Sequence, residues 1–213
     1  MDRLDRNRIK TFDPFNPAHV SEFRKLMDKE DTPEMHEKFG MFLASSEIES
    51  YAEEAIGHLE IAVDAGLADA AGQLGYMYFN GIGVEKDTEK GMDLYLDGAY
   101  RGSYESMFLL GNEYMRGTNV KADYGKAFDY LSESAEGGND RAMNTLGVMY
   151  LCGYHVDKDV KMAKRLFLKS KARGNMNAAM NLILIDENGP DFDYKTMVES
   201  EGGTADYNWG GDE

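Results

Sequence analysis

The sequence predicts an all-α solenoid, a stack of antiparallel helix pairs, because one pattern recurs at a step of 36 residues. The pair Leu-Gly stands at Leu74-Gly75, Leu110-Gly111 and Leu146-Gly147. Four further positions keep the same step: Tyr78, Tyr114 and Tyr150; Gly81, Gly117 and Gly153; Val84, Val120 and Val156; Asp87, Asp123 and Asp159. A period of about 20–50 residues is typical of solenoids and propellers. Within each unit the apolar residues follow helical spacing rather than strand alternation.

Each unit is predicted to contain two helices, A and B. In the unit from Asp69 to Gly102, the first half places Ala71, Leu74 and Tyr78 on one stripe, and residues 90–99 repeat that spacing. The glycine of the Leu-Gly pair lies in the middle of helix A, where glycine costs about 1 kcal/mol relative to alanine. A cost that recurs at one position predicts close approach of helix A to helix B, which a Cβ atom would prevent.

The loop between the helices is also predicted from the repeat. Gly81, Gly117 and Gly153 should end helix A in the left-handed conformation. Two residues later stand Gly83, Asn119 and His155, and we interpret this position as a second left-handed residue, because Asn and His are enriched there among residues other than glycine. Asp87, Asp123 and Asp159 are predicted N-caps of helix B.

The pattern Leu-Gly-x-x-Tyr-x-x-Gly-x-Gly-Val-x-x-Asp-x-x-Lys-Ala resembles the Sel1-like repeat family, relatives of tetratricopeptide repeats. Leu74 to Val84 matches it closely, and Lys126-Ala127 supplies the final pair. Single residues depart from it: Gly91, Met162, Asn119 and His155. The resemblance covers roughly residues 35–186. It implies a right-handed α/α superhelix and a protein-binding role, and it does not imply an enzyme.

Three regions are predicted. Residues 1–34 form an N-terminal segment with a capping helix from about Pro17 to Lys29, in which Asn16-Pro17 and Thr32-Pro33 each combine an N-cap with proline at the first helical position. Residues 35–186 form the repeat array, with units of about 35–67, 68–103, 104–139 and 140–175 and a partial unit 176–186. Residues 187–213 form an acidic C-terminal cap and tail, in which Phe192, Tyr194 and Met197 are expected to cover the open face of residues 176–185.

Composition limits the classes of partner. Thirty-nine acidic residues against 23 Lys and Arg give a formal net charge of −16, which opposes binding to nucleic acid or to an anionic membrane and favours a basic partner. No apolar run approaches the roughly 18 residues of a membrane span, and the first residues lack the apolar core of a signal peptide. We therefore expect a soluble cytoplasmic protein. The sequence makes no prediction of oligomeric state.

No catalytic, cofactor or metal site is predicted. The four histidines, His19, His36, His58 and His155, are scattered, with no His-x-x-x-His or Cys-x-x-Cys pairing. Cys152 is the single cysteine; a catalytic thiol would need a neighbouring base, and the sequence indicates none.

The candidate site is a surface for a protein or peptide. By analogy with tetratricopeptide arrays, the A helices line the concave side, and positions offset from the Leu-Gly pair should face that groove. These positions are Tyr76, Phe79, Asn80, Phe108, Asn112, Met115, Arg116, Asn144, Val148, Leu151 and Met180. Phe79, Met115 and Leu151 share one repeat position and would form an apolar ladder. The alternative is that these residues are ordinary packing between repeats.

Two functional hypotheses follow. The first is a non-enzymatic adaptor that binds a protein or peptide through the concave face. The alternative is an acidic inhibitor or immunity-type protein that occludes a basic active site or nucleic-acid-binding site of its partner. Added salt should weaken the second kind of complex strongly and the first only slightly.

Overall fold

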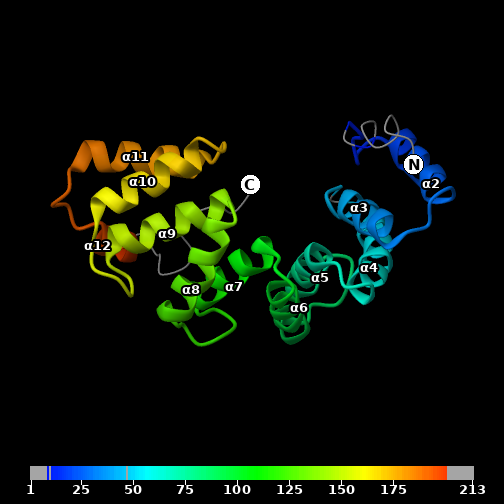
Figure 1. The fold of residues 1–213 in the computed structure, drawn as a ribbon, viewed down its shortest axis with the longest axis horizontal. Helices are drawn as coiled ribbons and strands as arrows, with labels where there is room; N and C mark the ends of the chain where they lie inside the picture. The colour runs from blue at the N-terminus through cyan, green and yellow to red at the C-terminus, as the bar shows by residue number, and fades with distance from the viewer. Residues whose placement is uncertain (1–8, 10, 47, 201–213) are drawn as a thin grey trace. The chain divides into compact units, whose positions relative to one another are not determined.

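The computed structural model describes residues 9, 11–46 and 48–200, without the side chains of residues 198–200. Within these residues the chain forms eleven α-helices and no strand (Figure 1). Their bounds are α2 Pro17–Met27, α3 Pro33–Ala44, α4 Glu49–Asp64, α5 Ala68–Asn80, α6 Thr88–Tyr100, α7 Tyr104–Arg116, α8 Tyr124–Glu136, α9 Asp140–Cys152, α10 Val160–Lys171, α11 Met176–Asn188 and α12 Tyr194–Ser200. The predicted all-α array of helix pairs is confirmed.

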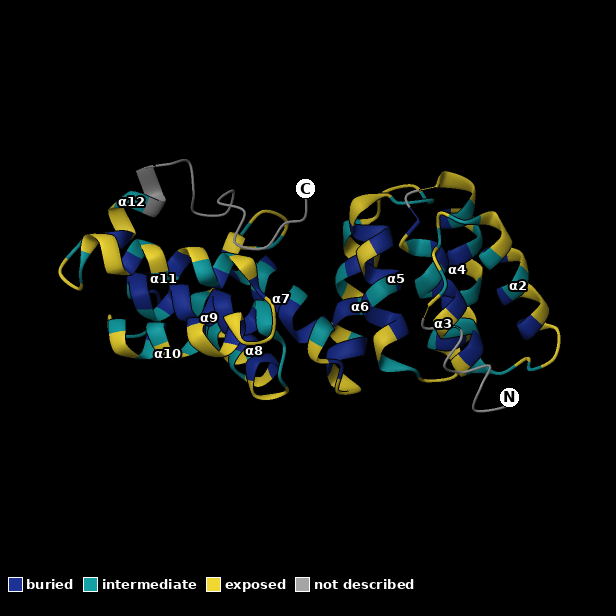
Figure 2. Cartoon of the chain, turned by 90° about the horizontal axis from the view of Figure 1, so that it is seen from above, coloured by how far each residue is buried: buried dark blue, intermediate teal, exposed yellow. Residues whose placement is uncertain are grey.

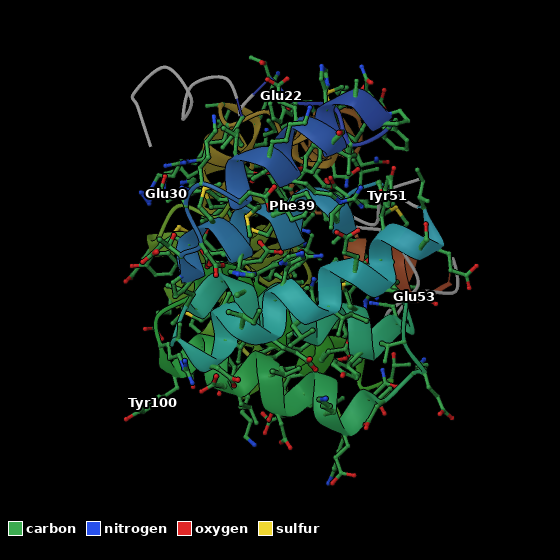
Figure 3. The ribbon with its side chains drawn as sticks, turned by 90° about the vertical axis from the view of Figure 1, so that its right-hand side faces the viewer. Glu22, Glu30, Phe39, Tyr51, Glu53 and Tyr100 are labelled. Atoms are coloured by element: carbon green, nitrogen blue, oxygen red, sulfur yellow. The ribbon has the colours of Figure 1, made fainter. Side chains whose placement is uncertain are left out.

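The chain divides into two compact units, Met1–Ser106 and Met107–Glu213. The first contains α2 and the pairs α3–α4 and α5–α6. The second contains most of α7, which pairs with α8, then the pair α9–α10, followed by α11 and α12. Each unit has its own apolar core. In the first unit, Phe39 lies inside between the helices, whereas Glu53 is exposed at the surface (Figure 3).

The N-caps of helix B are confirmed in all three full repeats. The side chain of Asp87 accepts a hydrogen bond from the backbone N–H of Lys90 at 2.9 Å, and Asp123 and Asp159 cap α8 and α10 in the same way. The backbone N–H of each aspartate also donates to a tyrosine carbonyl of the preceding helix A at 2.9 Å, from Asp87 to Tyr78, Asp123 to Tyr114 and Asp159 to Tyr150. One residue therefore starts helix B and closes the loop. Asn16 and Thr32 are also confirmed as N-caps.

The glycine of the Leu-Gly pair does face helix B. A Cβ atom added to Gly111 would lie 2.6 Å from Leu131 Cγ and 3.3 Å from the carbonyl oxygen of Ala127. The same relation joins Gly75 to Tyr95 and Gly147 to Phe167, always 20 residues apart. In the degenerate first repeat, Gly40 meets Leu59 instead. The bare backbone lets a large apolar residue of helix B lie directly against helix A, and this contact forms the centre of each repeat.

Neighbouring repeats are joined at the start of helix A. Ser103 and Asn175, which cap α7 and α11, also donate to an aspartate at the start of the preceding helix A, Asp69 at 2.8 Å and Asp140 at 3.0 Å respectively. The N-cap position of α5 is occupied by Leu67, whose side chain makes no capping hydrogen bond. There Glu37 of the preceding repeat accepts a hydrogen bond from the N–H of Ala70, although burial, with the charge of Asp69, raises the pKa of its carboxyl group.

The second left-handed position of the loop is occupied in two repeats and not in the third. Gly83 and His155 both have φ of 65°, as predicted. Asn119 was predicted to share this conformation, and that prediction is wrong, because His155 is the one residue other than glycine with positive φ in the described chain. The Asn119 side chain instead donates to Glu113 Oε2 at 3.2 Å. A polar anchor in α7 thus replaces the left-handed turn.

This difference predicts unequal responses to the same substitution at the two equivalent positions. We expect His155→Val to destabilise the protein by about 1–2 kcal/mol, because a β-branched residue is strained at positive φ. Asn119→Val should lack this conformational cost. Urea denaturation of both variants gives the loss in free energy of unfolding for each. An equal loss from both would show that the backbone conformation of His155 does not set its cost.

The C-terminal apolar residues pack against the second unit, but they do not cover the predicted face. Tyr194 is fully buried in the core of that unit, and the partly buried Phe192 and Met197 pack against this core. Helix α12 contacts α9, and Lys158 Nζ, in the loop after α9, donates to the carbonyl oxygen of Phe192 at 2.7 Å. The outer face of α11 stays exposed. The position of α12 was therefore predicted wrongly, because the core of the preceding repeat holds these aromatic residues.

Candidate protein-binding surface

The structure separates the eleven predicted surface residues into two groups. Six are buried: Phe79, Phe108, Met115, Asn144, Val148 and Leu151. Five are exposed or half-buried: Tyr76, Asn80, Asn112, Arg116 and Met180. The second group contains the residues that a partner can reach without rearrangement of the fold.

The predicted apolar ladder lies inside the repeats. Phe79 packs on Tyr95 with ring centroids 5.7 Å apart, and its Cβ lies 3.0 Å from where a Cβ of Gly91 would stand. This position of helix A therefore faces helix B. Met115 and Leu151 occupy the same repeat position and are also buried. Because the side chains at this position face helix B, they do not line a groove as predicted.

The predicted amides also differ in their roles. Asn144 is fully buried, and its Oδ1 accepts a hydrogen bond from Asn181 Nδ2 at 2.9 Å, so the pair joins α9 to α11. Asn80 is exposed, and its Nδ2 donates to the carbonyl oxygen of Tyr76 at 2.9 Å. Asn112 is half-buried on α7. A buried amide pair is satisfied within the fold, so Asn144 is a packing residue.

The exposed residues recur at two positions of helix A. Tyr76 and Asn112 directly follow the glycine of the Leu-Gly pair, and Asn80 and Arg116 stand four residues further on. Residues four apart lie on one side of a helix, so α5 and α7 each present two accessible side chains together. Tyr76 is 42% exposed.

The same positions are closed in α9. Val148 and Cys152 stand there, and both are buried in the cluster that includes Tyr194 and the partly buried Phe192 of the C-terminal segment. Residues 142–149 of α9 are buried without a break (Figure 2). In the second unit, Val148 and Cys152 are thus enclosed in a core to which the C-terminal segment contributes apolar side chains.

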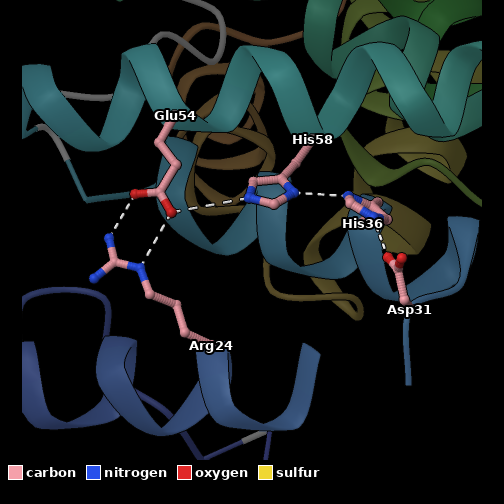
Figure 4. A network of polar contacts seen from close by, with 5 residues as sticks. All are labelled: Arg24, Asp31, His36, Glu54 and His58. Atoms are coloured by element: carbon pink, nitrogen blue, oxygen red, sulfur yellow. Dashed lines mark hydrogen bonds and ion pairs between the residues drawn. The ribbon is translucent and has the colours of Figure 1, made fainter. Parts of the chain in front are cut away.

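A polar network in the first unit was not predicted from the sequence (Figure 4). His36 Nδ1 and His58 Nδ1 lie 2.7 Å apart, and His36 Nε2 is 2.7 Å from Asp31 Oδ1. His58 Nε2 lies 3.9 Å from Glu54 Oε1, and Arg24 binds both oxygens of Glu54 at 3.1 and 2.5 Å. The network joins α2, α3 and α4. The repeat positions offered an indirect signal, because His36 is one turn before Gly40 and His58 directly precedes Leu59, and Gly40 and Leu59 pack together.

Two facing Nδ1 atoms share one hydrogen, so one ring must donate and the other accept. Burial lowers the pKa of His58 below its ordinary value of 6.5, and the neighbouring His36 and Arg24 act in the same direction against Glu54. The folded state thus favours neutral His58. Its stabilising contribution is complete above the unfolded pKa of about 6.5 and is lost as pH falls below it, because the unfolded chain then binds more protons.

We therefore expect the first unit to be less stable at about pH 5.5 than at about pH 7.5, with a smaller difference in His58→Gln. Thermal denaturation of both proteins at the two pH values gives the measurement. The same loss in the variant and the wild type would assign the pH dependence to other groups.

No metal-binding arrangement of three or more His, Cys, Asp or Glu side chains occurs in the part of the chain that the structure describes. Among the same residues, no helix has the length and apolar character needed to cross a membrane.

These features define a class of protein: an all-α repeat scaffold whose helix pairs share one glycine contact and one capping aspartate. The chain belongs to the Sel1 repeat family, since the model of that family, Sel1 repeat, matches residues 68–103, 105–139 and 140–175. Scaffolds of this family are generally protein-interaction modules and typically lack catalytic activity.

Two solved structures illustrate the similarity. A Sel1 repeat protein from Oxalobacter formigenes is 25% identical over 75% of this chain and 71% of that chain, with a TM-score of 0.62. The protein c5321, a protective antigen of uropathogenic Escherichia coli strains that displays an SLR fold, is 21% identical over 84% of this chain and 47% of that chain, with a TM-score of 0.51. The second likeness concerns the fold alone. No curated protein matches the sequence.

Proposed function

We propose that the protein is a non-enzymatic adaptor that binds a protein or peptide through the exposed positions of its A helices, on the side that is expected to be concave. The residues are Tyr76 and Asn80 on α5 and Asn112 and Arg116 on α7. The observation that carries the proposal is that two repeat positions are accessible on these helices, whereas α9 holds them inside a core that includes the chain's own C-terminal aromatic residues.

The side chains suit recognition of an extended segment. A tyrosine ring supplies apolar contact area and a hydroxyl group at low entropic cost, and tyrosine and arginine are enriched among residues that dominate binding energy. Asparagine amides and the guanidinium group can hydrogen-bond the backbone or a side chain of the partner. The net charge of −16 would attract a basic partner at long range.

The proposal can be tested by affinity capture from a lysate of the source organism, with the bound proteins identified by mass spectrometry. The double variant Tyr76→Ala, Arg116→Ala is compared with the wild type and with the control Tyr100→Ala. Tyr100 is 92% exposed at the end of α6, where it points away from the helices in Figure 3. We expect the wild type and the control to capture the same partner and the double variant to lose it.

Salt separates the adaptor from the acidic inhibitor. Capture through apolar and amide contacts should persist between about 50 mM and about 300 mM salt, whereas a complex held by net charge should dissociate. Loss of the partner with salt, combined with full capture by the double variant, contradicts the adaptor proposal and favours the acidic inhibitor.

A further inference from the structure

The outer face of α11 exposes three apolar side chains, and two of them, Met180 and Ile183, stand at positions that form contacts in the preceding repeats. Met176, Met180 and Ile183 are 76%, 63% and 50% exposed. They are spaced by four and three residues, so they lie on one side of the helix. A contiguous exposed apolar patch on a folded protein is typical of a site that contacts another molecule.

Met180 occupies the position that touches the next helix A. In the earlier repeats, a Cβ atom added to Gly72 would lie 2.6 Å from Ser106 Oγ, and Arg141 lies over the ring of Phe108 at 4.5 Å. Asn144 accepts its hydrogen bond from Asn181. Each of these contacts reaches the following helix A. Met180 remains 63% exposed, so no described residue covers it in this way.

Ile183 occupies the position of the packing glycine. Gly75, Gly111 and Gly147 lie against helix B of their own repeat. The short helix that follows α11 is α12, and it contacts α9 instead. The isoleucine that replaces glycine therefore extends an apolar side chain outward, where a helix B would otherwise stand.

We propose that this face binds a second copy of the chain, with the two α11 helices antiparallel about a two-fold axis. An axis between Asn181 and Leu182 places Met180 of one copy opposite Ile183 of the second copy. The same axis places Met176 opposite Glu187, because Met176 precedes Met180 by four residues and Glu187 follows Ile183 by four. A two-fold interface uses the same patch on both copies, and this stripe is self-complementary in that register.

Charge at the two ends of α11 favours this occupant. Lys171 and Arg173 are exposed just before the helix, and Glu187 and Asp191 are exposed at and after its end. Antiparallel pairing brings the acidic end of one copy to the basic end of the other, and it also places Glu187 near a helix N-terminus, where a carboxylate is stabilised. Parallel pairing would bring like charges together.

The test is sedimentation velocity of the full chain between about 1 and about 100 µM. We expect a concentration-dependent dimer, and we expect Met180→Glu and Ile183→Glu each to raise the dissociation constant about tenfold or more. The matched control is Leu168→Glu on α10, because Leu168 is 55% exposed and its repeat equivalent Leu96 is exposed as well, so this position is not specific to the open face. A wild type that stays monomeric overturns the proposal, as does a dimer unaffected by both variants.

A charge exchange tests the two-fold geometry. The variants Lys171→Glu, Arg173→Glu and Glu187→Lys, Asp191→Lys should each dimerise more weakly than the wild type. Mixing the two variants should restore dimers, because each interface then pairs opposite charges at both ends. Failure of the mixture to recover dimers, with each double variant weakened on its own, would overturn the antiparallel arrangement of the two copies. The adaptor proposal does not depend on this result, since it uses α5 and α7.

Discussion

Gly83→Ala is expected to destabilise the first unit by about 2–5 kcal/mol, the sum of left-handed strain and overpacking. Gly83 has φ of 65°, and an added Cβ would lie 2.5 Å from the backbone carbon of Ala52 and 2.7 Å from the backbone nitrogen of Glu53. These atoms belong to α4, so the methyl group would force a backbone segment rather than a flexible side chain to move. Urea denaturation followed by circular dichroism measures the loss.

Gly102→Ala separates the two causes. Gly102 has φ of 94°, and no heavy atom lies within 4 Å of an added Cβ. This control should show the conformational strain without the overlap and should lose only about 1–2 kcal/mol. If Gly83→Ala lost no more than Gly102→Ala, the close contact between the loop and α4 would carry no energetic weight.

Gly111→Leu is expected to destabilise the second unit by about 1–3 kcal/mol or more, because the larger side chain must displace Leu131 from the centre of the repeat. Gly111→Ala should also destabilise the unit, because its methyl group meets the same leucine at 2.6 Å. The loss should be smaller than for Gly111→Leu, because the added group is smaller.

The matched control is Gly57, which is exposed within α4 and has no heavy atom within 4 Å of an added Cβ. There alanine should stabilise the protein by up to about 1 kcal/mol through its higher helix propensity. Opposite signs for Gly57→Ala and Gly111→Ala are the expected result in urea denaturation. A stabilised Gly111→Ala would show that helix B does not require the bare backbone.

The repeat period predicted these contacts because it reports what is common to all units. Gly75, Gly111 and Gly147 shared a position whose cost needed a cause, and the cause is a helix B residue 20 positions later. The capping aspartates were predictable for the same reason. A residue that makes the same contact in each unit recurs at the repeat period, so a single sequence is enough to reveal it.

Features set by a particular neighbour were not predictable in this way. Residue 83 is glycine because the backbone of α4 lies against it, whereas at residue 155 a histidine fits, because Gly125 leaves room beside its ring and Phe128 packs on it. At the third equivalent position Asn119 binds Glu113 instead. These residues share a period and differ in surroundings.

The candidate surface was predicted in part for the same reason. The offset from the Leu-Gly pair located Tyr76 and Asn112 on helix A, but it could not tell that position 79 points toward helix B. Nor could it show that residues 148 and 152 would be buried in a core that contains the C-terminal aromatic residues. The histidine pair was missed because its two members lie on different helices, and the order of residues along the chain does not show which side chains meet.

The most direct test of the adaptor proposal is photo-cross-linking in the source organism, with p-benzoylphenylalanine placed in turn at Tyr76, at Arg116 and at Tyr100. We expect positions 76 and 116 to cross-link to the same partner protein and position 100, on the last turn of α6, not to cross-link to it. Cross-linking of the partner at position 100 alone, with none at 76 or 116, would contradict the claim that the exposed positions of the A helices bind it.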